Sequence, residues 1–458
     1  MGCFPSREKR EVLNLVRGGR NSLGNARLMH HLVLWEEYEL DNHVLGTGMN
    51  GDVVRIRSVH DSTLKFALKT IRKSSTFCLE EIILYLEIDH PNICKIMEVY
   101  ESKDYVYLVT ELCGGGDLFS HLKRSAYFNE ITTIILVSQI LKSVHYLHSI
   151  GIVHGDLKLE NFVYRNRTLK LIDFGFAHKR HLNPTHFGGS PLYMAPELTS
   201  VNNTHYSPST VQSDIWSIGI IVYMLLTGKL PIHDQIDLGP NIASENAKNF
   251  VSACLEKNPV TRLTCVQGLG HPWLKIIKGG TAVGSDEVEL LKLLVEFSKM
   301  GPLQRASLCL IALHSSNSSK CLDTLFSHMD TNSDGFIRES ELEAMLNFHH
   351  LPSKNIFKKI DLTGDGRLNF SELFAATEIW KATANPDTHM QTMINAVFRK
   401  FDVDQSGTIS HANLEAVFGG SGYQGTNVSQ LIREGDFQGD GVISKDEFLQ
   451  LVTNRVVP

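Results

Sequence analysis

The 458-residue sequence lacks a cysteine framework, a long apolar run and a strong excess of either charge. Its eight cysteines are scattered, with no Cys-x-x-Cys spacing, which indicates a reducing compartment and free thiols. No uninterrupted apolar stretch approaches the about 18 residues that span a bilayer, and no apolar signal-peptide segment follows Met1. We therefore expect a cytoplasmic protein that does not cross a membrane.

The overall composition is that of an ordinary soluble globular protein. Apolar residues make up 42% of the chain and charged residues 21%. A formal net charge of -6 is small for this length and argues against a general nucleic-acid binder. The length exceeds what a single hydrophobic core usually supports, so we expect two or three domains.

The first six residues carry a lipidation pattern. They fit M-G-x-x-x-[ST], in which Gly2 accepts myristate and the adjacent Cys3 suits palmitate. Two acyl signals anchor a protein stably, whereas one binds only marginally, and the basic residues that follow would be attracted to anionic lipid. Short motifs also arise by chance, and Pro5 is not an ideal neighbour. We expect an acylated arm on the cytosolic face of a membrane.

Apolar periodicity and turn residues divide the chain into four expected segments. A basic arm occupies residues 1–37 and is expected to lack regular structure to about residue 35. Residues 38–274 begin with β-rich segments and continue with helices, and residues 275–318 combine a glycine-rich linker with apolar positions at helical spacing. Residues 319–458 contain four Asp-rich loops at roughly 31 to 41-residue intervals, the period of helix–loop–helix EF-hands.

A glycine-rich stretch in the second segment predicts phosphate binding. Residues 45–53 match G-x-G-x-x-G-x-V, in which glycines let backbone N–H groups approach phosphate oxygens, although a tight turn alone would also explain them. Lys69 on the next predicted strand suits the α- and β-phosphates, and Glu81 on the following predicted helix suits an ion pair with it, with Glu80 as the alternative register. The other candidate nucleotide contacts here are Leu45, Gly46, Gly48, Gly51, Val53 and Ala67.

A second run supplies the residues for phosphoryl transfer. Asp156 can accept the proton of a substrate hydroxyl, and Lys158 can neutralise charge on the transferring phosphoryl group. Asn161 and Asp173, the latter in Asp-Phe-Gly, offer oxygen ligands to Mg²⁺. A carboxylate alone is more often a solvated surface charge, so the prediction depends on their order and spacing.

Together these motifs resemble eukaryotic protein kinases over residues 38–274. The resemblance implies an α+β, bilobal fold that uses ATP and Mg²⁺, with a β-rich N-lobe and a helical C-lobe. Lys-x-x-Asn after Asp156 is similar to serine/threonine rather than tyrosine kinases. Glu197, in the motif Ala195-Pro196-Glu197, is expected to pair with a buried Arg262. Asp214 is expected near the start of a core helix. By the family pattern the adenine and ribose contacts are Thr110, Glu111, Cys113 and Asp117.

Two positions depart from the kinase pattern. Gly155 replaces the arginine that normally binds a phosphate on the activation loop, so phosphorylation there, for example of Thr185, should not be required. Between Pro231 and Ala247 the chain is markedly shorter than in the family, where a substrate-facing helix belongs. Either this helix is absent or the sequence has lost a segment, and peptide docking is the function affected.

The four Asp-rich loops predict calcium binding, because an EF-hand loop places oxygens at positions 1, 3, 5, 7, 9 and 12 around a glycine at 6. The loops span residues 330–341, 361–372, 402–413 and 436–447. The third ends in Asn413 instead of Glu, so we expect weak or absent binding there. The expected ligands of the first loop are Asp330, Asn332, Asp334, the Phe336 carbonyl and Glu341. Those of the second are Asp361, Thr363, Asp365, the Arg367 carbonyl and Glu372. Those of the fourth are Asp436, Gln438, Asp440, the Val442 carbonyl and Glu447, and the weak set is Asp402, Asp404, Ser406 and Thr408. The residues at position 8, expected to join paired loops through a short β-bridge, are Ile337, Leu368, Ile409 and Ile443.

A kinase segment, an amphipathic connector and four EF-hands in this order resemble plant and protist calcium-dependent protein kinases. The resemblance implies that the connector, here roughly residues 285–318, occludes the substrate cleft at low calcium and is bound by the calcium-loaded EF-hands. Lys299 and Arg305 could mimic a basic substrate or simply pack, and Ser307 could be an autophosphorylation site or a chance match. Asp117 with Glu160 would favour protein substrates with basic residues near the target Ser or Thr.

Three interpretations of function follow from the sequence. The first is a calcium-activated, ATP-dependent serine/threonine kinase at a membrane surface. The second is a calcium-sensing pseudokinase scaffold, which the Gly155 change and the short C-lobe favour but the complete set of phosphoryl-transfer residues argues against. The third is a constitutive kinase fused to a calcium-buffering domain, which requires a connector that cannot bind the EF-hands.

Overall fold

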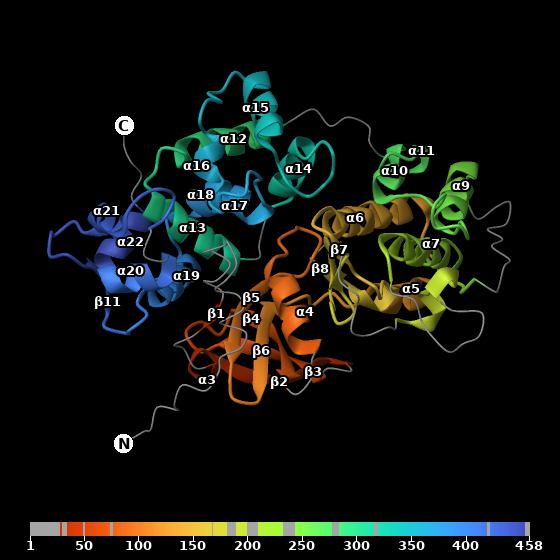
Figure 1. Ribbon diagram of the computed structural model, residues 1–458, viewed down its shortest axis with the longest axis horizontal. Helices are drawn as coiled ribbons and strands as arrows, with labels where there is room; N and C mark the ends of the chain where they lie inside the picture. Colours follow the sequence, from red (N-terminus) through yellow and green to blue (C-terminus); the bar gives the residue numbers. More distant parts are fainter. Residues whose placement is uncertain are drawn as a thin grey trace.

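The computed structural model describes residues 28–29, 34–48, 51–73, 77–166, 168–180, 189–198, 209–231, 243–276, 284–315, 319–418 and 422–453. The lipidation residues Gly2 and Cys3, Thr185, and most of the shortened stretch after Pro231 lie outside the described residues. The described chain forms a kinase-like half and a helical half that lie side by side (Figure 1). Within the described residues, no helix is both long and apolar enough to cross a membrane.

A six-stranded sheet forms the N-terminal lobe, in the order β1-β5-β6-β4-β3-β2. Neighbouring strands are antiparallel except β1, which runs parallel to β5. Helix α4 (Phe77–Leu86) joins the sheet through a core that contains Tyr85, Ile71 and Leu108. The strands are β1 (Leu28–Met29), β2 (Tyr38–Gly48), β3 (Gly51–Ser58), β4 (Lys65–Arg72), β5 (Ile96–Glu101) and β6 (Tyr105–Glu111).

The sequence-based boundary of the N-terminal arm is wrong by several residues. We expected no regular structure to about residue 35, yet Leu28 and Met29 pair with Val99 and Tyr100 as an edge strand. Helix α3 (Leu34–Glu37) follows and buries Leu34. Two residues are too short for periodicity to reveal, because what stabilises β1 is pairing with a strand some seventy residues further along the chain.

The C-terminal lobe is built around two long apolar helices, α6 (Glu130–Ser149) and α7 (Val211–Thr227). Asn129 caps α6, a Thr210–Ser213 capping box begins α7, and Gly228 in the left-handed conformation ends α7. The shorter helices are α5 (Leu118–Ser125), α9 (Glu245–Cys254), α10 (Cys265–Leu269) and α11 (Pro272–Lys275). The remaining short elements are β7 (Ile152–Val153), η1 (Leu159–Asn161), β8 (Phe162–Arg165), β9 (Thr168–Leu171), β10 (His178–Lys179), η2 (Pro191–Tyr193) and η3 (Pro196–Leu198).

The expected pair between Glu197 and Arg262 is confirmed. The guanidinium donates Nη1 to Oε1 at 2.6 Å and Nη2 to Oε2 at 2.9 Å, and its side chain is fully buried. Arg262 also donates to the carbonyl oxygens of Gln212 and Glu256, so all three guanidinium nitrogens form hydrogen bonds. This cluster joins the end of the activation segment to α7. Asp214 lies in the first turn of α7, as expected.

The connector forms two helices, α12 (Ser285–Phe297) and α13 (Pro302–His314), which confirms the helical spacing in this stretch. Their apolar residues, including Leu294 and Leu308, belong to the same core as the EF-hand helices. The other helices of this half are α14 (Lys320–Met329), α15 (Glu339–Phe348), α16 (Phe357–Ile360), α17 (Phe370–Phe374), the π-helix η4 (Ala375–Ile379), α18 (Trp380–Thr383), α19 (Thr388–Phe401), α20 (His411–Phe418), α21 (Val428–Gly435) and α22 (Lys445–Thr453).

The EF-hands are paired through their position-8 residues, as expected. Ile337 and Leu368 exchange two backbone hydrogen bonds, of 2.9 and 2.8 Å, across the first pair. In the second pair, β11 (Thr408–Ile409) and β12 (Ile443–Ser444) place Ile409 opposite Ile443. All four isoleucine or leucine side chains are fully buried, so the bridge and the apolar core hold each pair of loops together.

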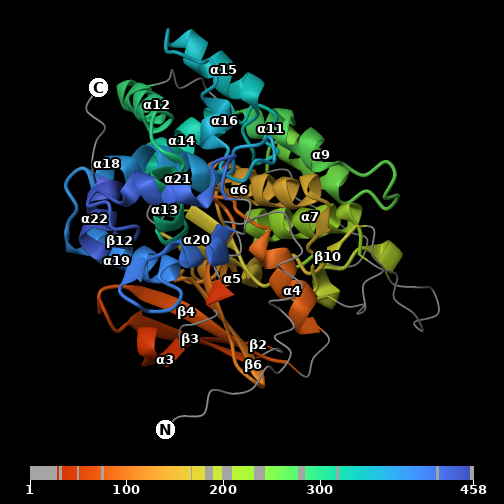
Figure 2. The same cartoon turned by 60° about the vertical axis from the view of Figure 1, so that its left-hand side comes forward.

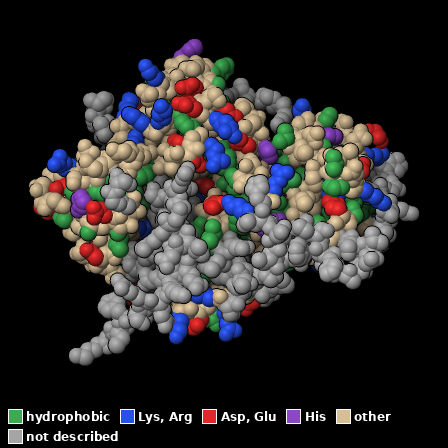
Figure 3. Space-filling model, in the orientation of Figure 1, with side chains coloured by type: hydrophobic (Ala, Val, Ile, Leu, Met, Phe, Trp, Pro, Cys, Tyr) green, Lys and Arg blue, Asp and Glu red, His purple; other side chains and the backbone are tan. Residues whose placement is uncertain are grey.

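The contacts of the EF-hand half with the kinase half include its first two loops, α13 and α19. The ring of Phe336 lies 5.1 Å from the ring of Tyr146 on α6, and the hydroxyl of Ser149 donates to the Asp334 carbonyl at 3.2 Å. Lys95 donates to the Ala312 carbonyl at 2.9 Å and to the Ser371 hydroxyl at 2.8 Å. Turning the molecule by 60° leaves the EF-hand helices beside α6 and the sheet (Figure 2). On the face in Figure 3, positive and negative side chains are interspersed over the described surface.

Candidate active site and calcium-binding loops

The catalytic loop brings Asp156, Lys158 and Asn161 together. Lys158 Nζ lies 2.6 Å from Asp156 Oδ2 and 3.2 Å from the hydroxyl of Ser190. The Ser190 amide donates to Asp156 Oδ1 at 2.7 Å, and Asn161 Nδ2 donates to the Asp156 carbonyl at 2.8 Å. Asp156 is 6% exposed, so its carboxylate is fixed at the floor of the site and not free to rotate in solvent.

Asp214 fixes this loop from below. Its carboxylate accepts hydrogen bonds from the backbone amides of His154 and Gly155, both at 3.0 Å, and from His148 Nε2 at 2.8 Å. Burial alone would raise the pKa of Asp214, but the hydrogen bonds and charge of His148, with those of His154, lower it overall. An ionised Asp214 therefore anchors the backbone on which Asp156 stands.

Asp173 faces the strand lysine. Lys69 Nζ lies 3.3 Å from Asp173 Oδ1, and although burial raises the pKa of Asp173, the charge of Lys69 lowers it overall. Asp173 has φ of 63°, a left-handed conformation that turns its carboxylate toward the lysine. The next residue, Phe174, is fully buried between the rings of Tyr85 on α4 and His154, at centroid distances of 4.6 and 5.3 Å. The Asp-Phe-Gly segment is thus held by both lobes.

The glycine-rich hairpin lies over the same strand. Gly46 pairs with Val53 and Gly48 pairs with Gly51 between β2 and β3, while Val53 lies opposite Lys69 on β4. Gly51 has φ of 120°, and a Cβ there would lie 2.7 Å from the Thr70 carbonyl oxygen, so only glycine fits. Leu45 and Gly46 are exposed and Ala67 is buried. The side chain of Glu81 lies outside the described residues, although the backbone of α4 includes it.

The expected adenine and ribose contacts lie between the end of β6 and the start of α5. Thr110 lies opposite Ala67 on β4. The Glu111 carboxylate is bonded to Lys170 at 2.9 Å and to Arg165 at 3.1 Å, which leaves its backbone for the adenine contact that the kinase resemblance implies. Cys113 is half-buried, and its hydrogen bond with Cys94, together with burial, raises the pKa of its thiol. Asp117 caps α5 by accepting from the Ser120 amide at 2.7 Å.

Gly155 occupies a position where a larger residue is strained. Its φ is 78°, and a Cβ would lie 2.8 Å from Ser209 Oγ and 2.9 Å from the Phe176 carbonyl oxygen. Gly151 has a similar φ of 74° but no atom within 4 Å of its Cβ position. The glycine at 155 therefore matches a backbone that is both left-handed and crowded.

Restoring the family arginine should therefore be harmful. We expect Gly155→Arg to lower the free energy of unfolding by about 1–3 kcal/mol more than Gly151→Arg does. Both positions have a left-handed backbone, but only at 155 would the new side chain collide with the Phe176 backbone. Urea unfolding of the full chain measures the difference. Equal destabilisation by the two variants would contradict the crowding at 155.

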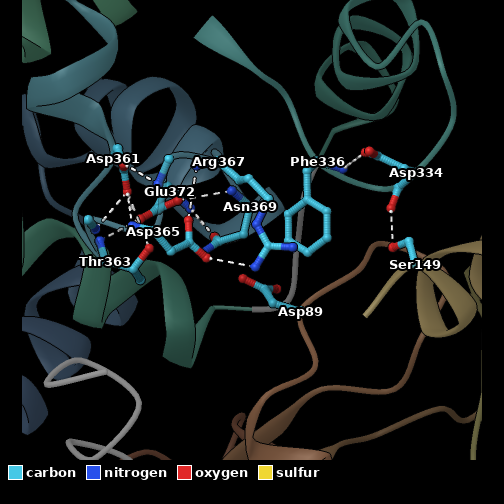
Figure 4. Close-up of polar contacts among 12 residues, drawn as sticks. Asp89, Ser149, Asp334, Phe336, Asp361, Thr363, Asp365, Arg367, Asn369 and Glu372 are labelled. Carbon is cyan, nitrogen blue, oxygen red and sulfur yellow. Dashed lines mark hydrogen bonds and ion pairs between the residues drawn. The ribbon is translucent and has the colours of Figure 1, made fainter. Parts of the chain in front are cut away.

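The first two calcium loops are closed by their terminal glutamates. Glu341 accepts from the Thr331 amide at 3.0 Å and the Arg338 amide at 2.9 Å. Glu372 accepts from Leu362 and Thr363 amides at 2.8 and 2.9 Å, and burial raises its pKa well above the usual value. Figure 4 shows Glu372 in loop 2 beside Asp361 and Asp365. Arg367 extends from the same loop over Phe336, with its guanidinium 4.2 Å from the ring centre.

The fourth loop repeats this arrangement and the third does not. Glu447 accepts from the Phe437 and Gln438 amides, both at 2.9 Å. In the third loop the Asn413 side-chain oxygen accepts from the amide and hydroxyl of Ser410, at 2.8 and 2.9 Å. The amide cannot supply the second charged oxygen that a position-12 glutamate gives to calcium. The expectation of weak binding at this loop stays a prediction.

The donor chemistry of loops 1, 2 and 4 suits calcium. In each loop the first aspartate accepts hydrogen bonds from several backbone amides. Asp330, for example, accepts from the Asp334 and Gly335 amides at 3.0 and 2.9 Å, which fixes its carboxylate at the loop centre. Burial and the neighbouring carboxylates raise the pKa of Asp330 to about 7 despite those amides, a crowding of negative charge that a divalent cation would relieve. In the described residues, no three Asp, Glu, His or Cys side chains converge closely enough to hold a metal alone, so amide, hydroxyl and carbonyl oxygens must contribute.

Some functional contacts escaped the sequence. The hydrogen bond between His148 on α6 and Asp214 on α7 joins residues that are far apart in the sequence, so no short motif predicts it. Ser190 was not predicted as a site residue, yet both its amide and its hydroxyl contact the catalytic loop. For Glu111 a signal existed: alternate strand residues point to opposite faces, so a Thr110 that faces the nucleotide predicts a Glu111 that does not.

Comparison with known proteins agrees with this geometry. The protein kinase domain family matches residues 39–274, and the EF-hand domain pair matches residues 320–378 and 391–453. Calcium-dependent protein kinase 5 of Plasmodium falciparum (isolate 3D7) is 30% identical over 93% of this chain and 79% of its own length. In Arabidopsis thaliana, calcium-dependent protein kinase 34 is 30% identical, covering 89% of this chain and 83% of its own length, and calcium-dependent protein kinase 17 is 31% identical, covering 89% and 82%. With an assembled serine/threonine kinase site joined to paired EF-hands, this chain belongs to the calcium-dependent protein kinase family.

Proposed function

We propose that this protein is switched on by calcium through movement of its connector, helices α12 and α13. The observation that carries the proposal is the place of α13: the EF-hand half encloses it, from a fully buried Leu303 to Leu313, while the kinase site is assembled. Arg305 is 6% exposed and donates to Gln424 Oε1 at 2.8 Å, so it packs in the EF-hand half and does not imitate a substrate in this arrangement. Ser307 is fully buried, which makes it inaccessible to phosphorylation here.

In the proposed reaction, each residue of the catalytic loop has one task. Asp156 orients the substrate Ser or Thr hydroxyl and accepts its proton, and Lys158, 2.6 Å away, stabilises charge on the transferring phosphoryl group. Lys69 holds the α- and β-phosphates of ATP. Asn161 and Asp173 would hold Mg²⁺, which neutralises phosphate charge. The glycine-rich ends of β2 and β3 would cover the phosphates with backbone N–H groups and exclude water.

The proposed calcium sites are loops 1, 2 and 4. Loop 1 would use Asp330, Asn332, Asp334, the Phe336 carbonyl and Glu341, and the other two loops use the equivalent positions. Loop 1 also touches the kinase half, because Phe336 packs on Tyr146 and the Asp334 carbonyl accepts from Ser149. Calcium would thus stabilise both the enclosure of α13 and the surface that rests on α6.

Hydrogen exchange of the full chain tests the movement. In EGTA we expect the amides of α13 (Pro302–His314) to lose protection and the catalytic loop, residues 154–161, to gain it, since the connector then covers the substrate cleft. Calcium should reverse both changes. If α13 is equally protected in EGTA and in calcium, the connector does not move and the protein is a kinase with an attached calcium buffer.

We further propose that acylation places the kinase on the cytosolic face of a membrane. The support is the sequence Met1-Gly2-Cys3, with basic residues after it. In a myristoylating host, Gly2→Ala should move the protein from the membrane fraction to the soluble fraction, because the palmitate on Cys3 normally follows membrane contact by myristate. Ser22→Ala lies outside the six-residue motif, keeps the acceptor glycine and serves as the comparison. Retention of Gly2→Ala on membranes would contradict the anchor.

The pseudokinase alternative has two sequence features in its favour, the replacement at Gly155 and the short stretch between Pro231 and Ala247. Two sets of contacts oppose it: Asp156 is bonded to Lys158 and, through its carbonyl, to Asn161, and Asp173 is bonded to Lys69. A scaffold has no need of either arrangement. We therefore favour an active enzyme that acts on protein Ser or Thr with nearby basic residues, attracted by Glu160 and Asp117.

A further inference from the structure

The helix that enters the third EF-hand lies on the N-terminal lobe of the kinase. In both ribbon views α19 (Thr388–Phe401) sits beside the sheet and α3 (Figures 1 and 2). Three basic side chains of α19 each meet a carboxylate of that lobe. The pairs are Lys400 with Glu98 at 3.2 Å, Arg399 with Glu37 at 2.9 Å, and His389, if protonated, with Asp61 at 3.8 Å.

The Lys400–Glu98 pair is buried and therefore different in kind from a surface ion pair. The two side chains are 4% and 8% exposed. Glu98 also accepts from the hydroxyls of Tyr38 and Tyr100, both at 2.7 Å, and His314 at the end of α13 lies 3.7 Å away. Burial would raise the pKa of Glu98, but Lys400, His314 and the tyrosines lower it to about 2, so it stays ionised at neutral pH. The Glu98 carboxylate thus contacts basic side chains from two separate elements of the regulatory half, α19 and α13.

The same EF-hand has lost a calcium ligand. Its loop ends in Asn413, whose oxygen accepts from Ser410. The entering helix nonetheless keeps a buried apolar face, with Phe398 and Phe401 in the EF-hand core, and a charged face on the kinase. The third EF-hand therefore lacks the carboxylate that usually ends a calcium loop, while its entering helix carries basic side chains that bind the kinase lobe.

We propose that the third EF-hand is a docking arm for the kinase N-lobe, anchored by Lys400 on Glu98. The partner surface is acidic and belongs to this same chain: Glu37, Asp61 and Glu98. This inference goes beyond the calcium switch and does not rest on it, because the contact is defined without reference to calcium in loops 1, 2 or 4.

The anchor has a route to the nucleotide site. Glu98 on β5 lies opposite Val109 on β6, and the adjacent Leu108 lies opposite Lys69 on β4. Docking at Glu98 therefore restrains the strand next to the one that pairs with the lysine strand. Lys400 and Glu98 are positioning residues, since neither touches substrate, and their loss should be seen first in ATP binding.

The test compares Lys400→Met with Lys381→Met in the full chain with calcium. Lys381 also forms an ion pair, with Glu289 at 2.9 Å, but that pair is exposed and lies within the regulatory half. We expect Lys400→Met to speed exchange of the β5 amides, Ile96–Glu101, on the order of 100-fold and to raise the KM for ATP. The change removes the lysine charge from the buried Glu98 carboxylate, which then keeps, among the described residues, only two tyrosine hydroxyls and His314. Lys381→Met should change neither the β5 exchange rate nor the KM for ATP. Lys400→Arg keeps the positive charge and should leave both at their wild-type values.

Two further readouts keep the result interpretable. Arg399→Gln with His389→Gln removes the more exposed pairs without emptying the core and should speed β5 exchange a few fold. The number of calcium ions bound per chain should be the same in Lys400→Met and wild type. Identical β5 exchange in Lys400→Met and Lys381→Met would overturn the proposal, as would loss of a calcium ion together with β5 protection. A chain without calcium activation would refute the proposed switch and leave these comparisons unchanged.

Discussion

Asp173→Ala should abolish phosphoryl transfer, with a fall in kcat of at least about 10³-fold, which corresponds to several kcal/mol of lost transition-state stabilisation. The carboxylate faces Lys69 at 3.3 Å from a left-handed backbone, and it is the aspartate that we assign to Mg²⁺. Removing it takes away the metal ligand and leaves Lys69 without this partner. Steady-state transfer to a Ser-containing peptide measures the effect.

The backbone at this position calls for a second variant. Alanine is strained at φ of 63°, whereas asparagine adopts the left-handed region readily and has the shape of aspartate. Asp173→Asn should therefore fold as the wild type does and still lose most of the transfer, because it lacks the charge. Asp41→Ala, which removes an N-lobe carboxylate paired with Arg55, provides the control and should retain activity. Transfer by Asp173→Asn at the wild-type rate would refute the metal role.

Glu341→Gln together with Glu372→Gln should remove calcium activation in the physiological range, raising the calcium midpoint on the order of 10-fold or more. Each glutamate is the last ligand of its loop, and glutamine keeps the shape and one acceptor oxygen but loses the second charged oxygen. The glutamine oxygen can still accept from the Thr331 amide in loop 1 and from the Leu362 amide in loop 2. The bonds from the Arg338 and Asn369 amides to the second oxygen are lost, so circular dichroism of the variant is compared with that of the wild type to check its folding.

The control for this pair is Glu339→Gln, an exposed acid in the first turn of the same helix as Glu341. It should leave the calcium midpoint unchanged. Calorimetry separates binding from activation: the double variant should bind fewer calcium ions, and its ATP affinity should stay at the wild-type value. Full activation at the wild-type calcium concentration would show that loops 1 and 2 are not the sensors.

The sequence predicted those parts of the molecule whose chemistry is local. The position-8 residues of the EF-hands were expected to bridge, and Ile337–Leu368 and Ile409–Ile443 do, because a fixed loop length fixes the pairing position. The Glu197–Arg262 pair followed from two kinase motifs with known partners. In each case the residues that meet are specified by a short pattern.

What the sequence did not reveal depends on contacts between distant segments. Strand β1 exists only because β5 offers an edge, and the anionic cluster at Glu98 gathers residues from β2, β5, α13 and α19. The orientation of Glu111 was recoverable from strand alternation, but its partners Lys170 and Arg165 were not. Nothing near these residues in the sequence indicates which charges tertiary packing will bring together.

Calcium control of phosphoryl transfer is the property that the proposed function of this chain requires. We would test it by ³²P transfer from ATP and Mg²⁺ to a basic Ser-containing peptide, measured once with EGTA and once with excess calcium. We expect strong transfer with calcium and little without it, which would also show that the short stretch after Pro231 still permits peptide docking. Equal transfer in both conditions would contradict the switch, and no transfer in either would contradict the assignment of an active kinase.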